Sequence, residues 1–228
     1  MNKKKKNIII SVCLIIAAII FTILVKFVDV KAVGLQGTEL GFSTINKYVF
    51  KTLGENKIWY QISEWLGLIP LAVALCYAAT GVIQLKRRKN ILKVDKEIIA
   101  LGVFYAVVVF IYVLFEKVII NYRPILVDGV LEASYPSSHT LMSLCFAGSA
   151  IIINKKLFDN EKTQHMNKVL ILIAIMIVVG RLLAGVHWFT DIIGGILISS
   201  ALLMSYYTSL DYFKTPKLKD RTKKKIKK

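Results

Sequence analysis

The sequence predicts an all-α polytopic membrane protein, with six transmembrane helices in a bundle and both termini in the cytoplasm. The 228-residue chain is 56% hydrophobic with a mean hydropathy of +0.60, yet it carries a formal net charge of +17. A soluble nucleic-acid-binding domain does not combine that charge with that hydropathy, and a disordered chain is not this apolar. The apolar and charged residues are instead segregated along the chain. We therefore expect a lipid bilayer, and no nucleic acid, as its partner.

Six apolar stretches are close to the ~20 residues that a helix needs to cross a bilayer. They cover residues 8–28, 65–85, 98–115, 139–153, 168–185 and 188–210. The fourth is short for a span, but an odd number of spans would disrupt the charge pattern described next. The first follows four lysines, exceeds the apolar core of a signal peptide and precedes no small-residue cleavage pattern. We expect it to remain as an uncleaved span.

Lysine and arginine are distributed so that one membrane face carries the whole net charge. With the N-terminus inside, the cytoplasmic segments are residues 1–7, 86–97, 154–168 and 211–228, and they hold 23 of the 31 Lys and Arg residues. The other segments are neutral overall. This positive-inside pattern predicts a multi-pass protein of the cell membrane with both termini cytoplasmic. The basic tail either reports topology alone or also binds anionic lipid headgroups.

We divide the chain into three parts. An N-terminal span with a long outer loop covers residues 1–64, a five-span core covers 65–210, and the basic cytoplasmic tail covers 211–228. Within the outer loop, residues 44–53 fit either a short amphipathic helix at the membrane surface or a simple linker. In the last span, small residues indicate close helix packing more than a lateral access path for a lipid tail. These are Gly194, Gly195, Ser199 and Ser200.

Two histidines lie at the outer ends of spans, where ionisable groups are costly unless they serve a site. His187 and Asp191 are four residues apart and so share a helical face, which lets the carboxylate orient the imidazole and leave its other nitrogen free as a nucleophile. His139 follows a Pro-Ser-Ser turn at a helix start. Backbone N–H groups there, with the hydroxyls of Ser137 and Ser138, suit an anion.

Arginine is used sparingly, with five Arg against 26 Lys, yet two of the five lie beside these histidines. Arg123 and Arg181 offer planar forks that match phosphate oxygens bidentately. The third histidine, His165, falls in a cytoplasmic connection, and we expect no role for it. Each feature alone has an ordinary structural explanation, but their joint occurrence on one membrane face favours a phosphate site.

These residues resemble the three-part signature of the type-2 phosphatidic acid phosphatases, membrane relatives of the vanadium haloperoxidases and bacterial acid phosphatases. That signature reads Lys, six residues, Arg-Pro; then Pro-Ser-Gly-His; then Ser-Arg, five residues, His, three residues, Asp. Its third part matches from Arg181 through His187 to Asp191, its second at the Pro-Ser and His of residues 136–139, and its first at the Arg-Pro of residues 123–124. The resemblance makes residues 65–210 a phosphatase core.

Three positions depart from the signature. Lys117 precedes Arg123 by one residue fewer than the family pattern, which on a straight helix rotates it by ~100°. Local unwinding before the proline would restore its reach. Ser138 replaces the motif glycine, and Gly180 replaces the motif serine and so removes a hydroxyl, which Ser138 could supply.

The resemblance implies an integral-membrane phosphatase with its active site on the extracytoplasmic side. His187 would attack phosphorus and form a phosphohistidine, Asp191 would orient it, and His139 would protonate the leaving oxygen. The phosphate-binding residues would be Lys117, Arg123, Ser137, Ser138 and Arg181. The substrate would be a lipid phosphate or pyrophosphate: phosphatidic acid, phosphatidylglycerophosphate or a polyprenyl pyrophosphate. No metal and no cofactor are implied.

Two other functions fit parts of the pattern. A polytopic transporter or binding protein for an anionic ligand would use the same Arg and His residues without chemistry, although no paired broken helices indicate the inverted repeats of transporters. A vanadium haloperoxidase would use the same pocket for vanadate, but those relatives are soluble and six spans argue against it.

Overall fold

The computed structural model describes residues 2–158 and 160–211 of the chain. Its elements in chain order are α1 (Lys3–Phe27), β1 (Lys31–Ala32), η1 (Leu35–Gly37), β2 (Glu39–Leu40), α2 (Ser43–Leu53), α3 (Lys57–Arg88), η2 (Ile91–Lys93), α4 (Lys96–Lys117), α5 (Ser138–Leu157), α6 (Glu161–Leu183) and α7 (Phe189–Leu210). Beyond residue 211, the predicted basic tail lies outside the described residues.

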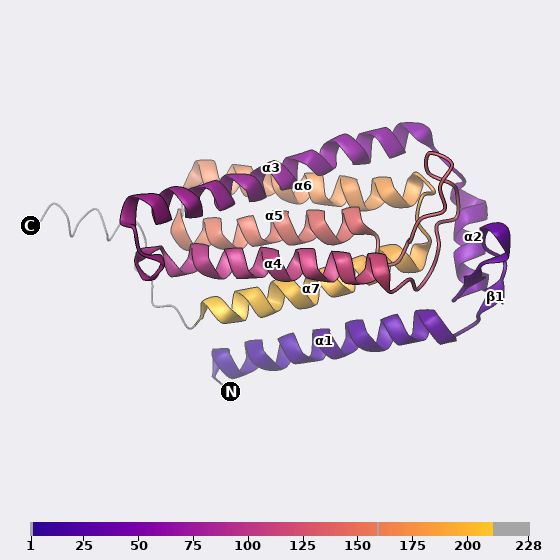
Figure 1. Ribbon diagram of the computed structural model, residues 1–228, viewed down its shortest axis with the longest axis horizontal. Coiled ribbons are helices and arrows are strands. Elements are labelled where there is room, and N and C mark those ends of the chain that lie inside the picture. Colours follow the sequence, from indigo (N-terminus) through magenta and orange to yellow (C-terminus); the bar gives the residue numbers. More distant parts are fainter. Residues whose placement is uncertain (1, 159, 212–228) are drawn as a thin grey trace, which may run out of the picture.

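Within the described part of the chain, six helices are long and apolar enough to cross a membrane. They are α1 and α3 to α7, whereas α2 is an 11-residue helix between the first two. Figure 1 shows the six long helices in one bundle, with α2 and the small β1–β2 hairpin across one end. The predicted six-helix membrane fold is confirmed.

α5 is the central helix of the bundle and packs against α3, α4, α6 and α7. In the most apolar 18-residue segment of α5, 61% is buried inside the protein, against 17% in the corresponding segment of α1. α5 is also the least apolar of the six, because a helix surrounded by protein can carry small and polar side chains where a lipid-facing helix cannot. This explains why the fourth span looked short in the sequence, although α5 has 20 residues.

α3 is longer than the predicted span of 65–85. It runs for 32 residues from Lys57 to Arg88. Asn56 caps its start, since the side-chain oxygen accepts hydrogen bonds from the N–H groups of Ile58 and Trp59 at 3.0 and 3.1 Å. The first turns of α3 carry polar residues, which lower the hydropathy of the sequence before residue 65. α3 therefore continues through residue 64, where we had placed a boundary between two parts of the chain.

The outer segment between α1 and α3 is structured. Of the two alternatives for residues 44–53, the structure has the helix and not the linker, because α2 spans Ser43–Leu53 and packs against α7. The expected position of this helix at a membrane surface stays a prediction. Its place in the fold puts it over the start of α7.

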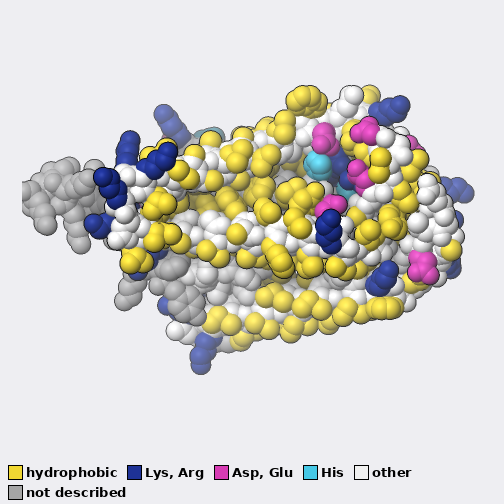
Figure 2. Space-filling view, viewed as in Figure 1, with side chains coloured by type: hydrophobic (Ala, Val, Ile, Leu, Met, Phe, Trp, Pro, Cys, Tyr) yellow, Lys and Arg dark blue, Asp and Glu magenta, His cyan; other side chains and the backbone are white. Residues whose placement is uncertain are grey.

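The two ends of the bundle differ in what they carry. Asn7 donates a hydrogen bond to Asp211 at 2.8 Å, so the start of α1 and the end of α7 lie together. Figure 1 shows the start of α5, the end of α6 and the start of α7 at the opposite end, which we call the site end. In the face shown in Figure 2, Lys and Arg side chains lie at both ends of the bundle, whereas Asp and Glu side chains group near the site end.

Two glycines on α7 permit close packing near the site end. A Cβ atom on Gly194 would lie 2.3 Å from the ring of Tyr135, and one on Gly195 would lie 2.9 Å from Thr140 Cγ2. The Tyr135 hydroxyl is hydrogen-bonded to Thr22 on α1 at 2.8 Å, and burial raises the pKa of Tyr135 to about 12. The interpretation as close helix packing is confirmed for Gly195, which meets α5, whereas Gly194 packs against the connection that precedes α5.

We expect Gly194→Ala to lower the thermal unfolding temperature of the detergent-solubilised protein. The added methyl group has no room beside the Tyr135 ring, and overpacking of this kind costs about 1–3 kcal/mol, or ~2–4 °C for each kcal/mol in a chain of this size. The matched control is Gly102→Ala on α4, where an added Cβ meets nothing within 4 Å. Equal unfolding temperatures for the two variants would contradict this packing.

Candidate functional site

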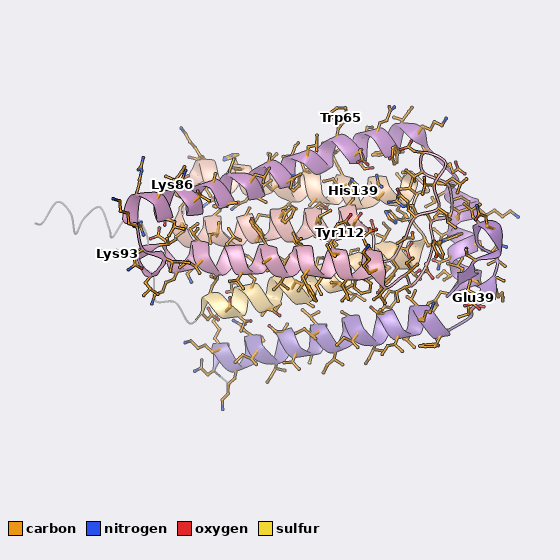
Figure 3. All side chains as sticks on the ribbon, viewed as in Figure 1. Glu39, Trp65, Lys86, Lys93, Tyr112 and His139 are labelled. Atoms are coloured by element: carbon orange, nitrogen blue, oxygen red, sulfur yellow. The ribbon has the colours of Figure 1, made fainter. Side chains whose placement is uncertain are left out.

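The motif residues meet at the site end, on three elements and two connections. The connection of residues 118–137 leads into α5, and the turn of residues 184–188 joins α6 to α7. Isolated bridges between Tyr122 and Ala133 and between Val127 and Val130 fold the first connection back on itself. Figure 3 places His139 toward this end of the bundle, whereas Lys86 and Lys93 lie at the other end.

His187 is buried in the turn between α6 and α7. Its Nδ1 lies 3.1 Å from the carbonyl oxygen of Ser134, which can only accept a hydrogen bond, so Nδ1 carries the proton. Its Nε2 is buried and has no hydrogen-bond partner among the described residues. Burial lowers the pKa of this imidazole well below the ordinary value of 6.5, and the charges of Arg123, Arg181 and His139 lower it further. His187 is therefore neutral, with a free lone pair on Nε2.

Asp191 acts on His187 through a third residue. Its Oδ2 lies 4.0 Å from His187 Nδ1, beyond a hydrogen bond, so the direct bond expected from the four-residue spacing is absent. The Ser134 hydroxyl lies between them: it donates a short hydrogen bond to Asp191 and is 3.2 Å from Nδ1. Asn121 and the backbone N–H of Trp188 also donate to the Asp191 carboxylate, at 3.3 and 2.9 Å.

Ser134 and Asn121 were missed by the sequence analysis. Each lies a few residues before a recognised motif, and no spacing or composition marks it. Only the fold shows that both reach a carboxylate 57 and 70 residues further along the chain.

His139 lies in the first turn of α5, as predicted. Its Nε2 is 3.3 Å from Oε1 of Glu64 on α3, and its Nδ1 is buried without a hydrogen-bond partner among the described residues. Ser137 caps the helix, because its hydroxyl accepts from the Thr140 N–H at 3.4 Å. Ser138 borders the pocket that also contains His187.

Both predicted arginines reach the site, and each is paired with a carboxylate. Arg181 is almost fully buried, donates to Glu64 Oε2 at 2.9 Å and lies over the ring of Tyr60, 5.1 Å from its centroid. Arg123 Nε lies 3.1 Å from Glu132 Oε2. Both carboxylate side chains are nearly half exposed, whereas both guanidiniums are buried. The arginines are thus fixed while their partners lie at the surface.

Lys117 is the last residue of α4, and its side chain is exposed there. The preceding residue, Glu116, borders the pocket with His187. The backbone from residue 118 to Arg123 is not helical, so the chain does unwind before the proline. The reach of Lys117 to a phosphate stays a prediction.

Gly180 owes its identity to the contact between α6 and α3. A Cβ atom there would lie 3.0 Å from Cβ of Ser63. The close approach brings Tyr60 and Glu64, on the same stretch of α3, to Arg181. Gly180 therefore replaces the serine of the motif at a position where α3 leaves no room for a side chain. The hydroxyl of Ser63 on α3 lies close to this position.

Three polar atoms at the site have no partner. His187 Nε2, His139 Nδ1 and Arg181 Nε are buried without hydrogen-bond partners among the described residues. Buried polar groups are normally satisfied, so we expect these atoms to meet a ligand. An anionic ligand would suit the two buried arginines.

Comparison with known families settles the class of protein. Residues 71–214, more than half of the chain, match the family model of the PAP2 superfamily. The chain belongs to the PAP2 superfamily. Among solved structures, this PAP2 protein is similar to the crystal structure of the first transmembrane PAP2 type phosphatidylglycerolphosphate phosphatase from Bacillus subtilis. The TM-score is 0.60 at 18% sequence identity, over 90% of this chain and 98% of that chain.

No curated protein sequence matches the chain. At 18% identity, the structural likeness shows the fold alone. The family match confirms the resemblance drawn from the motifs, and it identifies this PAP2 chain as a multi-pass member of a family of phosphatases.

We expect His187 to be neutral at pH 6.5, as the Nδ1–H tautomer, in histidine ¹⁵N NMR spectra assigned with a His187→Gln variant. An ordinary imidazole is about half protonated at that pH. Because the folded-state pKa is depressed, the unfolded chain binds more protons just below pH 6.5, so this residue makes stability fall as pH falls. A protonated ring at pH 6.5, or an Nε2–H tautomer, would contradict the site geometry.

Proposed function

We propose that the protein is an integral-membrane phosphatase that hydrolyses a lipid phosphate or pyrophosphate through a phosphohistidine on His187. The observation that carries this proposal is His187 itself: its tautomer is fixed by the Ser134 carbonyl, and its unpaired Nε2 is buried near two arginines. PAP2 membership supports hydrolysis over the alternative of an anion transporter with the same residues.

In the first step, the Nε2 lone pair of His187 forms a bond to phosphorus as the bond from phosphorus to the lipid oxygen breaks. That oxygen takes a proton from His139 and leaves as an alcohol, or as a monophosphate if the substrate is a pyrophosphate. The imidazole becomes a phosphorylated cation with its proton still on Nδ1. Asp191 stabilises this charge through the Ser134 hydroxyl.

In the second step, a water molecule gives a proton to His139 and its oxygen attacks the phosphohistidine. The phosphorus–nitrogen bond breaks, its electrons return to Nε2, and inorganic phosphate leaves. The guanidiniums of Arg123 and Arg181 are placed to hold the equatorial oxygens, where charge must be stabilised in both steps. Ser137 and Ser138, at the start of α5, add an N-terminal helix turn suited to an anion.

We propose that the reaction needs no metal. The buried guanidiniums of Arg123 and Arg181 would supply the positive charge that a metal supplies in other phosphatases.

The lipid substrate and the membrane face follow from the position of the site. A phosphate pocket at one end of a helix bundle accepts a headgroup while the hydrocarbon chain stays in lipid. The described Lys and Arg residues of segments 1–7 and 86–97 lie at the other end, which supports an extracytoplasmic site under the positive-inside rule. Phosphatidic acid, phosphatidylglycerophosphate and polyprenyl pyrophosphate are the candidates, and the name of the similar Bacillus subtilis protein supports the second.

We expect His187→Ala to lower phosphate release from this panel of lipids by at least about a thousandfold, because no other group can form the covalent intermediate. The assay uses purified protein in mixed micelles and measures inorganic phosphate with and without EDTA. Vanadate, which mimics the five-coordinate phosphorus, should inhibit the wild-type protein.

The matched control is His165→Ala, which removes an exposed histidine at the other end of the bundle. It should retain wild-type activity. Near-normal turnover by His187→Ala, activity that vanadate leaves intact, or a requirement for added metal would each overturn the mechanism.

We expect Glu64→Gln to tighten inhibition by inorganic phosphate about two- to fivefold. Glu64 is half exposed and competes with phosphate for Arg181, and an exposed pair of this kind is worth ~0.2–1 kcal/mol. Glu55→Gln, an exposed position just before α3, is the control. Weaker inhibition in Glu64→Gln would mean that the carboxylate supports phosphate binding instead.

A further inference from the structure

We propose that residues 41–56, which lie outside the region matched to the PAP2 family, form a positioning element for the nucleophile turn of residues 184–190, with Asn46 as its central residue. We call residues 41–56 the outer clamp. The inference rests on the proposed function, because it assigns the outer clamp a part in the reaction of His187. It also gives a role to the segment between α1 and α3, which the motifs leave unexplained.

Asn46 joins α2 to the first turn of α7. Its side chain is fully buried, and its Nδ2 donates to Thr190 Oγ1 at 2.9 Å and to the Gly41 carbonyl at 2.8 Å. Its Oδ1 accepts from the Thr190 N–H at 3.1 Å. That N–H is one of the first four of α7, which have no partner within the helix. Asn46 therefore caps α7 from a different helix, one residue before Asp191.

The outer clamp also holds the other side of the turn. The Asn56 N–H donates to the Ala184 carbonyl at 3.3 Å. Gly185 has a positive φ of 70°, and a Cβ atom there would lie 2.4 Å from the Gly54 carbonyl oxygen. The chain of the outer clamp thus touches the turn so closely that only glycine fits at residue 185.

An aromatic contact holds the middle of the turn. The ring of Phe50 lies 5.5 Å from that of Trp188, the residue after His187. The indole N–H of Trp188 donates to the Tyr122 carbonyl at 2.8 Å. The outer clamp therefore meets the nucleophile turn before, beside and after His187.

The outer clamp is itself anchored to α1. A Cβ atom on Gly41 would lie 1.6 Å from the Val25 carbonyl oxygen, so the backbones touch there. The Thr44 N–H donates to Asp29 Oδ2 at 2.7 Å. This bond, with side-chain hydrogen bonds from Thr44, Lys31 and Ser43, lowers the pKa of Asp29 to about 2. Asp29 therefore stays ionised and holds the start of α2 at any ordinary pH.

This arrangement predicts an effect on the rate of the chemical step more than on binding. Displacing an attacking atom by about 1 Å can cost ~100-fold in rate. Asn46 positions the turn that carries His187. The arginines that would bind phosphate are held separately, by Glu64 and Tyr60 on α3 and by Glu132. Loss of the outer clamp should therefore lower kcat and leave KM nearly unchanged.

The test compares Asn46→Ala, Asn46→Asp and Phe50→Ala with Lys47→Ala, an exposed position on the same helix. We expect Asn46→Ala to lower kcat about 10- to 100-fold with KM and phosphate inhibition within about twofold. Asn46→Asp keeps the acceptor for the Thr190 N–H and should recover part of the loss. Phe50→Ala removes only the ring contact, so it serves as the milder variant if Asn46→Ala does not fold.

Histidine ¹⁵N NMR gives a readout that does not depend on turnover. Asn46→Ala and Phe50→Ala should shift the His187 resonances, and Lys47→Ala should not. Unchanged His187 resonances in both variants, or an unchanged kcat in an active protein, would overturn the outer-clamp proposal. If the wild-type protein releases no phosphate from any lipid of the panel, the proposed function fails while the resonance shifts still test the positioning.

Discussion

The site end of the bundle depends on one buried carboxylate, that of Asp191. A charge taken out of water is costly unless it is surrounded by donors. Asn121, Ser134 and the Trp188 N–H supply them, and the Ser137 N–H bonds to the Asp191 backbone carbonyl at 3.0 Å. The hydrogen bonds to Asp191 therefore hold both connections and the starts of α5 and α7 in one arrangement. The orientation of His187 is a consequence of that arrangement, since the same Ser134 faces both residues.

The bundle can carry such a polar cluster because its helices are not equivalent. α1 is the most apolar span and is largely exposed, while α5 is the least apolar and is largely buried. Lipid contact is thus left to the outer helices. The central helix is free to begin with Ser138 and His139 and to pack against Gly195 of α7. The cost of ionisable groups near the membrane is limited further by placing them at helix ends, where backbone donors are available.

The spans and the motif residues could be predicted because their signals are local. Hydropathy identified all six long helices, and spacing identified His187, Asp191 and both arginines. Helix ends were less accurate where polar residues begin a span, as in the early start of α3 at Lys57. The contacts of Ser134, Glu64 and Asn46 with the site join residues 53 to 144 positions apart, and no local pattern encodes them. The reach of Lys117 stays a prediction, although the chain leaves the helix directly after it and before Arg123.

In the proposed mechanism, the charges around the pocket separate the binding of phosphate from its chemistry. Two guanidiniums buried near one neutral imidazole would repel each other without anions. The half-exposed carboxylates of Glu64 and Glu132, at the rim of the pocket, neutralise their charges. A phosphate that takes their place on the arginines exchanges one anion for another and leaves the buried charge balance nearly unchanged. The energy of binding then depends on how easily the rim carboxylates move into water. The proposed rate would instead depend on the fixed position of His187, whose turn the outer clamp holds at Ala184, Trp188 and Thr190.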